Sequence, residues 1–320
     1  MVSKIMNKKN TILLMLVISF IFFLLVFGET GFNLDVELIT QLRLPKVIVC
    51  LFAGGMLAIA GLLMQIFFQN PLAGPDILGI SSGSSLFVAF WMMTSVGLSQ
   101  TVMELGMSVM SFLGAITVFM LLIFLLHKNM SRVSLIIVGL LISSFTSSGI
   151  SILVSTSQAL QIKNYLMWSM GSFRTITSSE LPRFLILSLA SILPVLFVFK
   201  SLNQFLLSEN YAKSMGVDIK KMKIIFVSLA AFQISIVTMF CGPIGFIGII
   251  SPHLARTFIK RSHLKVLAPA VFLIGSLLAL LTEGVLVLMP TQSISVNAIL
   301  GIIGAPIIIL YLYRQREWTV

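Results

Sequence analysis

Apolar runs of about twenty residues, separated by short polar segments, recur along the whole chain. Breaks at Pro, Gly and charged residues divide this pattern into ten candidate helices. Their predicted bounds are 11–28, 47–68, 76–96, 104–126, 132–156, 182–200, 223–241, 245–260, 268–289 and 296–313. Because roughly 20 apolar residues cross a bilayer, the pattern predicts an all-α polytopic membrane protein with one transmembrane domain, residues 1–320.

Two connecting segments are longer than a hairpin between helices requires. The segment 157–181 contains Tyr165 and Trp168, which is typical of an interfacial or partly re-entrant helix. The segment 201–223 predicts a short amphipathic helix, about 205–216, followed by a basic turn. That helix could lie on the membrane surface, held by its lysines, or it could dock a cytoplasmic partner.

The composition agrees with a membrane protein and gives an orientation. The chain is 58% hydrophobic and 10% charged, whereas a soluble domain carries about 25% charged residues. If the N-terminus is inside, 16 of the 21 Lys and Arg residues lie in cytoplasmic segments. The positive-inside rule then predicts that both termini are cytoplasmic. The basic residues are scattered between apolar runs, unlike the clustered patch of a nucleic-acid-binding protein.

The sequence offers little catalytic chemistry of its own. It lacks the GxxxxGK[ST] phosphate-binding loop, so any ATP-driven step would need another polypeptide. His residues and acids are dispersed, which argues against an intramembrane protease, a hydrolase or a metal site. Cys50 and Cys241 lie in separate apolar runs and are interpreted as small buried hydrophobes.

Glu283 is the one acid well inside a predicted span. An intramembrane carboxyl group is a functional candidate, such as a proton site. The alternative is a structural group satisfied by a hydroxyl or an amide of a neighbouring helix. A proton-coupled transporter would be expected to carry more than one such acid, which favours the structural interpretation.

Four ordered blocks carry a resemblance that covers nearly the whole chain. They are RLPKVIVCLFAGGMLAIAGLLMQIFFQNPLAGPDILGISSGS, LLSENYAKSMGVDIKKMK, GPIGFIGIISPHLAR and GIIGAPIIILYLYR. With these blocks the chain resembles the permease subunits of bacterial ABC importers for iron-siderophores, haem and cobalamin. The resemblance implies a type II importer permease fold with ten helices, in the bacterial cytoplasmic membrane.

The resemblance also implies a set of partners. Two permease subunits, as a homodimer or a heterodimer, would face each other across the passage. Two cytoplasmic ATPase subunits would bind ATP and Mg, and an extracellular substrate-binding lipoprotein would deliver the substrate. This chain itself would be non-catalytic and would bind no cofactor. We expect an intact iron-siderophore complex as substrate, with haem or cobalamin as alternatives within the family. A secondary transporter that works without an ATPase is the alternative class.

Several positions match functional positions of the family. Arg43 and Lys46 match an outer basic pair that meets the binding protein. The predicted ATPase-coupling helix comprises Glu209, Asn210, Tyr211, Ala212, Lys213, Ser214, Met215 and Gly216. His253 and Arg256 match a structural block at the cytoplasmic end. Candidate residues of the translocation pathway are Gly54, Gly55, Met56, Gln65, Ser81 and Ser82.

The chain departs from the family pattern at its predicted outer mouth. The family often has Arg where Val287 stands, and Glu-Leu-Pro-x-Gly where residues 293–297 read Ser-Ile-Ser-Val-Asn. These changes leave Arg43 and Lys46 as the predicted contacts with the binding protein.

Overall fold

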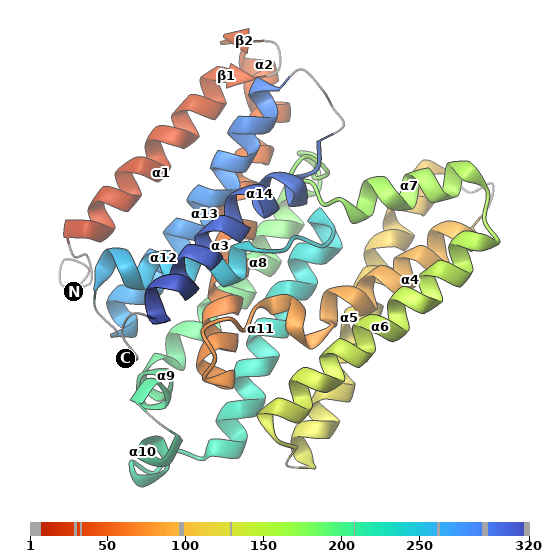
Figure 1. The fold of residues 1–320 in the computed structure, drawn as a ribbon. Helices are drawn as coiled ribbons and strands as arrows, with labels where there is room; N and C mark the ends of the chain where they lie inside the picture. Colours follow the sequence, from red (N-terminus) through yellow and green to blue (C-terminus); the bar gives the residue numbers. More distant parts are fainter. Residues whose placement is uncertain are drawn as a thin grey trace.

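The computed structural model describes residues 8–28, 31–32, 34–95, 99–128, 130–207, 209–260, 263–289 and 294–316. Helices dominate this part of the chain (Figure 1). The ten longer helices are α1 (Lys8–Val26), α3 (Leu44–Phe68), α4 (Ile80–Thr94), α5 (Gln100–His127), α6 (Arg132–Ser155), α8 (Leu181–Phe197), α11 (Ile219–Cys241), α12 (Ile247–Ile259), α13 (Leu264–Leu288) and α14 (Val296–Arg316). Each coincides with one predicted span, so the predicted helical membrane fold is confirmed.

Shorter elements connect these helices. They are α2 (Val36–Leu38), the π-helix η2 (Ile39–Arg43), the 3₁₀-helix η3 (Pro75–Leu78), α7 (Ala159–Ser169), α9 (Phe199–Leu207) and α10 (Glu209–Ser214). Two-residue strands β1 (Phe27–Gly28) and β2 (Gly31–Phe32) pair in an antiparallel hairpin.

Six of the described helices are long and apolar enough to cross a membrane. A seventh crossing results if α8 and α9, which meet at an angle of 59°, form one bent span. Helices α4 and α14 have shorter apolar stretches, and α12 has 13 residues. The total of ten crossings therefore stays a prediction.

Helix α3 is the centre of the larger helix group. Its residues from Ala53 to Phe68 are all buried, and it packs against α11, α12 and α13. Gly54 on α3 faces Gly275 on α13 so closely that a Cβ on either would overlap the other backbone. Small residues at such crossings allow the close packing that holds membrane helices together, because lipid gives no hydrophobic driving force.

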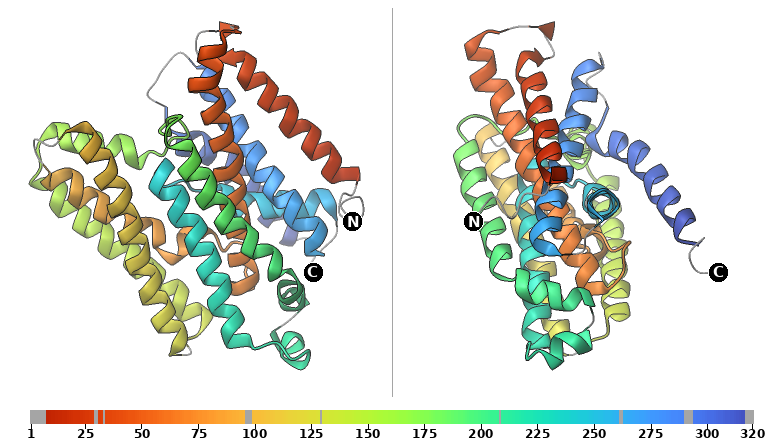
Figure 2. Two further views of the ribbon diagram at one scale, coloured as in Figure 1. Left: turned by 180° about the vertical axis from the view of Figure 1, so that it is seen from behind. Right: turned by 90° about the vertical axis from the view of Figure 1, so that its left-hand side faces the viewer.

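Helices α4 to α7 form a second group beside the first (Figure 1). Within it α4 packs on α5, α6 and α7, and α11 joins this group to α3. Helix α14 leans away from the body in the side view (Figure 2). The arrangement leaves two distinct ends. The hairpin and α2 lie at one end, and α9 and α10 lie at the other (Figure 1).

The start of α1 and the end of α14 lie in the half of the molecule that contains α9 and α10 (Figure 1). We call this the α10 end and the opposite one the hairpin end. That the α10 end faces the cytoplasm stays a prediction from the distribution of Lys and Arg.

Candidate functional site

Arg43 lies near the hairpin end and is nearly buried, with 6% of its surface exposed. Its Nη1 donates hydrogen bonds to the carbonyl oxygens of Leu25 (2.9 Å) and Val26 (2.8 Å). The guanidinium group thus satisfies carbonyls at the end of α1 that have no partner within the helix. Arg43 fixes α1 and the hairpin to the start of α3.

Glu283 on α13 is fully buried and lies between two basic side chains. The Nε of Arg174 donates to its Oε1 at 2.8 Å, and the Nζ of Lys46 lies 3.4 Å from the same oxygen. Removal from water strengthens the attraction between these charges. The cluster Lys46–Arg174–Glu283 therefore joins α3, α13 and the segment that follows α7.

This cluster bears on two predictions: the partner of Glu283, and the docking role of Arg43 and Lys46. The partners of Glu283 Oε1 are cations, so the expectation of a hydroxyl or amide partner is wrong. Arg174 was missed, although a buried acid requires a cation and Arg174 lies in a neighbouring outer segment. Docking by Arg43 and Lys46 stays a prediction, and both side chains have partners inside the protein.

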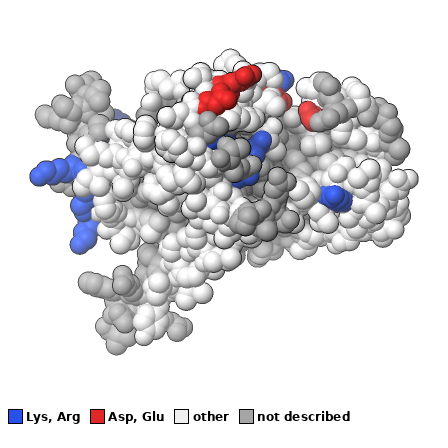
Figure 3. All heavy atoms as spheres, turned by 90° about the horizontal axis from the view of Figure 1, so that it is seen from above, with Lys and Arg blue, Asp and Glu red and all other residues white. Residues whose placement is uncertain are grey.

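Seen from above, the hairpin end shows few charged side chains on a largely uncharged surface (Figure 3). Exposed charged residues near this end include Asp35, Glu37, Lys163 and Arg183. Rim charges of this kind set the rate and orientation of protein encounters.

Toward the α10 end, hydrogen bonds fasten the turn after α3. Nη1 of Arg256 donates to Oε1 of Gln65 (2.7 Å), whose Nε2 donates to the carbonyl of Ile249 (3.2 Å). Nε2 of His253 lies 2.6 Å from the carbonyl oxygen of Pro71, which only a protonated Nε2 can bond. His253 and Arg256 thus link α12 to the end of α3 and to the turn 69–74.

A further hydrogen bond holds the same turn from the second helix group. Nη1 of Arg132, at the start of α6, donates to Oε1 of Gln69 at 2.6 Å. Gln69 has a left-handed backbone, with φ of 49°, and ends α3. The turn is therefore attached to both helix groups.

The six predicted pathway residues do not converge on one space. Gly54 and Gly55 face α13, and Sδ of Met56 accepts a hydrogen bond from Ser191 on α8 (3.2 Å). Gln65 belongs to the network with Arg256. Helix packing therefore occupies these positions within one protomer, and their pathway role stays a prediction.

Ser81 and Ser82 lie at the start of α4. Ser81 is buried, and Ser82 is half-buried with its Oγ 3.0 Å from Oγ of Ser143 on α6. Of the six predicted pathway residues, this pair lies nearest in sequence to the irregular segment 69–79, which contains η3.

The irregular segments that precede two short helices lie close to each other. Helices α4 and α12 have 15 and 13 residues, or about 22 and 20 Å, less than the roughly 30 Å of a hydrocarbon core. The segment 69–79 precedes α4, and the segment 242–246 precedes α12. Pro75 packs against Gly248, and a Cβ on Gly245 would lie 3.4 Å from Oδ2 of Asp76, whose side chain is exposed.

Asn297 on α14 holds the second irregular segment. Its Oδ1 accepts from the N–H of Gly245 (3.0 Å), and its Nδ2 donates to the carbonyls of Pro243 (2.8 Å) and Met170 (3.1 Å). This role was missed, because the sequence marks Asn297 only as a departure from the family pattern.

Phe246 forms a tight turn at the start of α12. Its φ is 65° and its ψ is −42°, and the N–H of Ile247 donates to the carbonyl of Gly245 at 2.8 Å. This is a γ-turn of the rare positive-φ kind. The Phe246 ring lies beside α14, where a Cβ on Gly301 would be 3.6 Å from it.

The predicted coupling helix, about 205–216, overlaps the end of α9 and contains α10; Ser208 between them lies outside the described residues. Leu202 and Phe205 bury α9 against the bundle, and Oδ1 of Asn203 accepts from the N–H of Leu264 at the start of α13 (2.9 Å). Helix α9 is therefore fastened to the core, and the shorter α10 lies at the tip of the molecule (Figure 1).

On α10, Ala212 is buried, whereas the other described side chains are exposed. These are Asn210, Tyr211, Lys213 and Ser214, followed by exposed Met215. Gly216 follows with φ of 79°, a conformation that favours glycine. Asp218 then caps α11 by accepting from the N–H of Lys221, which lowers the pKa of the Asp218 carboxyl. The side chain of Glu209 lies outside the described part.

The fold and its two ends are those of a polytopic membrane protein, with the short helix α10 exposed at one end. The FecCD transport family matches residues 6–314, and the chain belongs to this family. It is thus a non-catalytic membrane subunit of an ABC importer in the cytoplasmic membrane, where it works with ATPase and binding-protein partners.

Three relatives show the range of the family. The chain is 31% identical to the hemin transport permease HmuU of Yersinia pestis, over 87% of this chain and 83% of that protein. It is 29% identical to the vitamin B12 import permease BtuC of Photorhabdus laumondii subsp. laumondii (92% and 85% covered). It is 28% identical to the molybdate import permease MolB of Haemophilus influenzae (88% and 82% covered).

A solved structure has the same fold. It is described as an inward-facing conformation of a metal-chelate type ABC transporter, and it matches with a TM-score of 0.85 and 27% identity. The match covers 96% of this chain and 98% of the other.

Proposed function

We propose that this importer carries an intact iron-siderophore complex from an extracellular binding protein to the cytoplasm. The supporting observation is the likeness to a metal-chelate type transporter over nearly the whole chain. A ferric siderophore is also the commonest cargo of the family. Haem and cobalamin are the alternatives, and the molybdate relative shows that a small oxyanion also belongs in the test.

The proposed passage runs past the two irregular segments, 69–79 and 242–246. Irregular backbone at membrane depth is tolerated where it is buried in protein or lines a water-filled cavity. Asp76 is exposed at this meeting point and Ser82 is half-buried nearby in sequence. Together they would offer a carboxylate and a hydroxyl to a chelate.

A second permease subunit, identical or related, would close the passage against α14. Ile302 on α14 is 75% exposed, and Ile309 and Leu310 are also exposed. Cross-linking tests this contact. Ile302→Cys should form a disulfide-linked dimer in membranes if the partner is a second copy, whereas Ile186→Cys on α8 should not. Absence of the dimer in both would favour a different permease chain as partner.

The substrate assignment is tested by transport. The permease would be reconstituted in liposomes with its ATPase and its binding protein, and uptake of radiolabelled ferric siderophore, haem, cobalamin and molybdate measured. ATP-dependent uptake of the ferric siderophore alone is the expected result. Uptake of another cargo, or uptake of free iron without a chelator, contradicts the proposal. Transport by the chain without an ATPase would indicate a secondary transporter.

The docking of α10 to the ATPase is tested separately. Ala212→Pro should break α10, because proline removes a helix hydrogen bond and clashes with the preceding turn. We expect transport to be lost and ATP hydrolysis to become independent of the binding protein. Lys220→Ala, at an exposed position of α11 outside the predicted coupling residues, is the control. Normal coupled transport by Ala212→Pro would contradict the assignment.

A further inference from the structure

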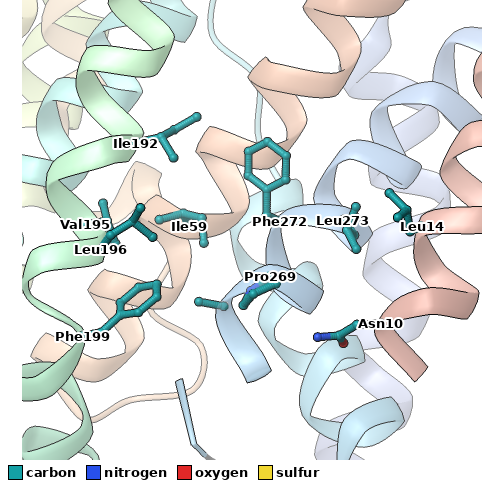
Figure 4. A pocket seen from close by; sticks show the side chains of 11 residues that line it. Asn10, Leu14, Ile59, Ile192, Val195, Leu196, Phe199, Pro269, Phe272 and Leu273 are labelled. Carbon is teal, nitrogen blue, oxygen red and sulfur yellow. The ribbon is translucent and has the colours of Figure 1, made fainter. Parts of the chain in front are cut away.

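An apolar cavity of about 330 Å³ opens between α1, α3, α13 and the α8–α9 junction. Figure 4 shows side chains from these helices around one common space. The walls include Ile59 of α3, Leu196 of α8, Phe199 of α9 and Phe272 of α13. With the exception of Asn10 on α1, every side chain that lines the cavity is apolar. The volume is that of a small-molecule pocket.

The chain bends beside the cavity. Pro194 lies inside α8, and α9 departs from α8 at 59°. Proline removes one helix hydrogen bond and disturbs the turn before it. Leu196 of α8 and Phe199 of α9, on either side of this bend, both line the cavity. Leu196, at the bend, is 53% exposed, so the cavity is open at the molecular surface.

The chemistry of the cavity suits one chain of a lipid. An apolar cavity has no partners for water, whose stable sites need two to four polar groups. The surface of a membrane helix bundle meets acyl chains, and these are apolar, narrow and flexible. An acyl chain that enters beside Leu196 would contact Ile59 and Phe272 and would complete the packing around the bend.

Polar and charged groups near the cavity indicate which class of lipid it binds. Lys200 directly follows Phe199, and Lys265 precedes Pro269 by one helical turn; both lysine side chains are exposed. Lysines near the membrane surface attract anionic headgroups. Asn10, only 2% exposed, lines the cavity, and its Oδ1 has no partner among the described residues.

We propose that this cavity binds one anionic phospholipid of the leaflet at the α10 end. One acyl chain occupies the cavity, and the phosphate lies between Lys200 and Lys265. The lipid then supports α9, which leads directly into the docking helix α10. Binding is a property of the permease itself and is independent of the transported substrate.

Native mass spectrometry of the purified permease tests the proposal. The protein would be loaded with phosphatidylglycerol or with phosphatidylcholine of the same acyl chains. We expect retention of one phosphatidylglycerol per chain at high collision energy, and at least tenfold less phosphatidylcholine. Equal retention of the two lipids, or retention of neither, would overturn the proposal.

Two kinds of variant test the headgroup contact and the acyl-chain contact separately. Lys200→Gln with Lys265→Gln should reduce retention of phosphatidylglycerol at least tenfold, whereas Lys128→Gln with Lys220→Gln changes the net charge equally and should not. Leu196→Trp should fill the opening and prevent retention of either lipid. Leu196 is exposed, so the indole replaces no core packing. Unchanged retention in Leu196→Trp, or equal losses in both lysine pairs, would show that the lipid lies elsewhere.

Discussion

Helices α3 and α6 have similar lengths, 25 and 24 residues, and both are apolar enough to span a membrane. They nevertheless have opposite surroundings. In the apolar stretch that contains α3, 83% of the residues are buried by protein, against 17% in α6. Hydrophobicity alone therefore identifies a span and says nothing about whether protein or lipid surrounds it.

Helices α3 and α6 differ in how their small and large residues are placed relative to neighbouring helices. On α3, Gly54 meets the backbone of α13, and Gly61 meets the backbone of α12 at Gly248. On α6, Gly139 also meets backbone, at Ile77 of η3, but large side chains such as Leu140, Leu141 and Phe145 face outward. A helix at the centre of a membrane bundle must present backbone to its neighbours, since close contact is what holds such helices together.

The largest effect should follow from enlarging a glycine of α3. A Cβ on Gly61 would overlap the backbone of Gly248, and backbone cannot move aside as a side chain can. Gly61→Leu should therefore prevent α12 from packing on α3 and abolish the monodisperse peak in detergent size-exclusion chromatography. Gly301→Ala is the control, because its Cβ would lie at an ordinary 3.6 Å from Phe246. Monodisperse Gly61→Leu protein would refute the close crossing.

A smaller loss should follow from removing the buried acid that links α3 to α13. Glu283→Ala leaves Lys46 and Arg174 together without their counter-charge. Breaking a buried pair costs about 3–5 kcal/mol, and we expect the low end because Arg174 is partly exposed. Denaturation in detergent would measure the change. Glu104→Gln, at an exposed acid of the second group, should change the free energy of unfolding little. Equal losses of stability in the two variants would contradict the prediction that Glu283 links α3 to α13.

The smallest effect should come from the outer face of α6. Leu141 is 62% exposed, so Leu141→Ala removes contacts with lipid and few with protein. We expect a change in unfolding free energy of about 0.5 kcal/mol or less, as for surface substitutions in general. Leu63→Ala on α3, at a fully packed position, should cost clearly more in the same assay. Similar losses at the two leucines would mean that a partner subunit covers α6.

Much of this fold could be predicted from the sequence, because membrane helices satisfy their own backbone and reveal themselves by apolar length. The family blocks also located α10. Small residues predicted a compact bundle, but their pattern did not tell which helix each glycine of α3 would face.

The candidate site was less predictable, because its contacts join distant parts of the chain. Glu283 stood out as an intramembrane acid, but its partner Arg174 lies 109 residues earlier. Asn297 bonds to Gly245 and Met170, on two further segments. Such contacts depend on how helices are arranged in space, which periodicity within one helix does not encode.

The turn at Phe246 holds the backbone of the permease in a strained conformation. A non-glycine residue in such a conformation costs on the order of 1–3 kcal/mol, and its surroundings must hold it there. The ring contacts α14, and Asn297 of α14 also holds Gly245. Displacement of α14 would release both restraints together and let the backbone before α12 relax. About 1.4 kcal/mol shifts an equilibrium tenfold, so strain of this size at one residue is large enough to shift a conformational equilibrium.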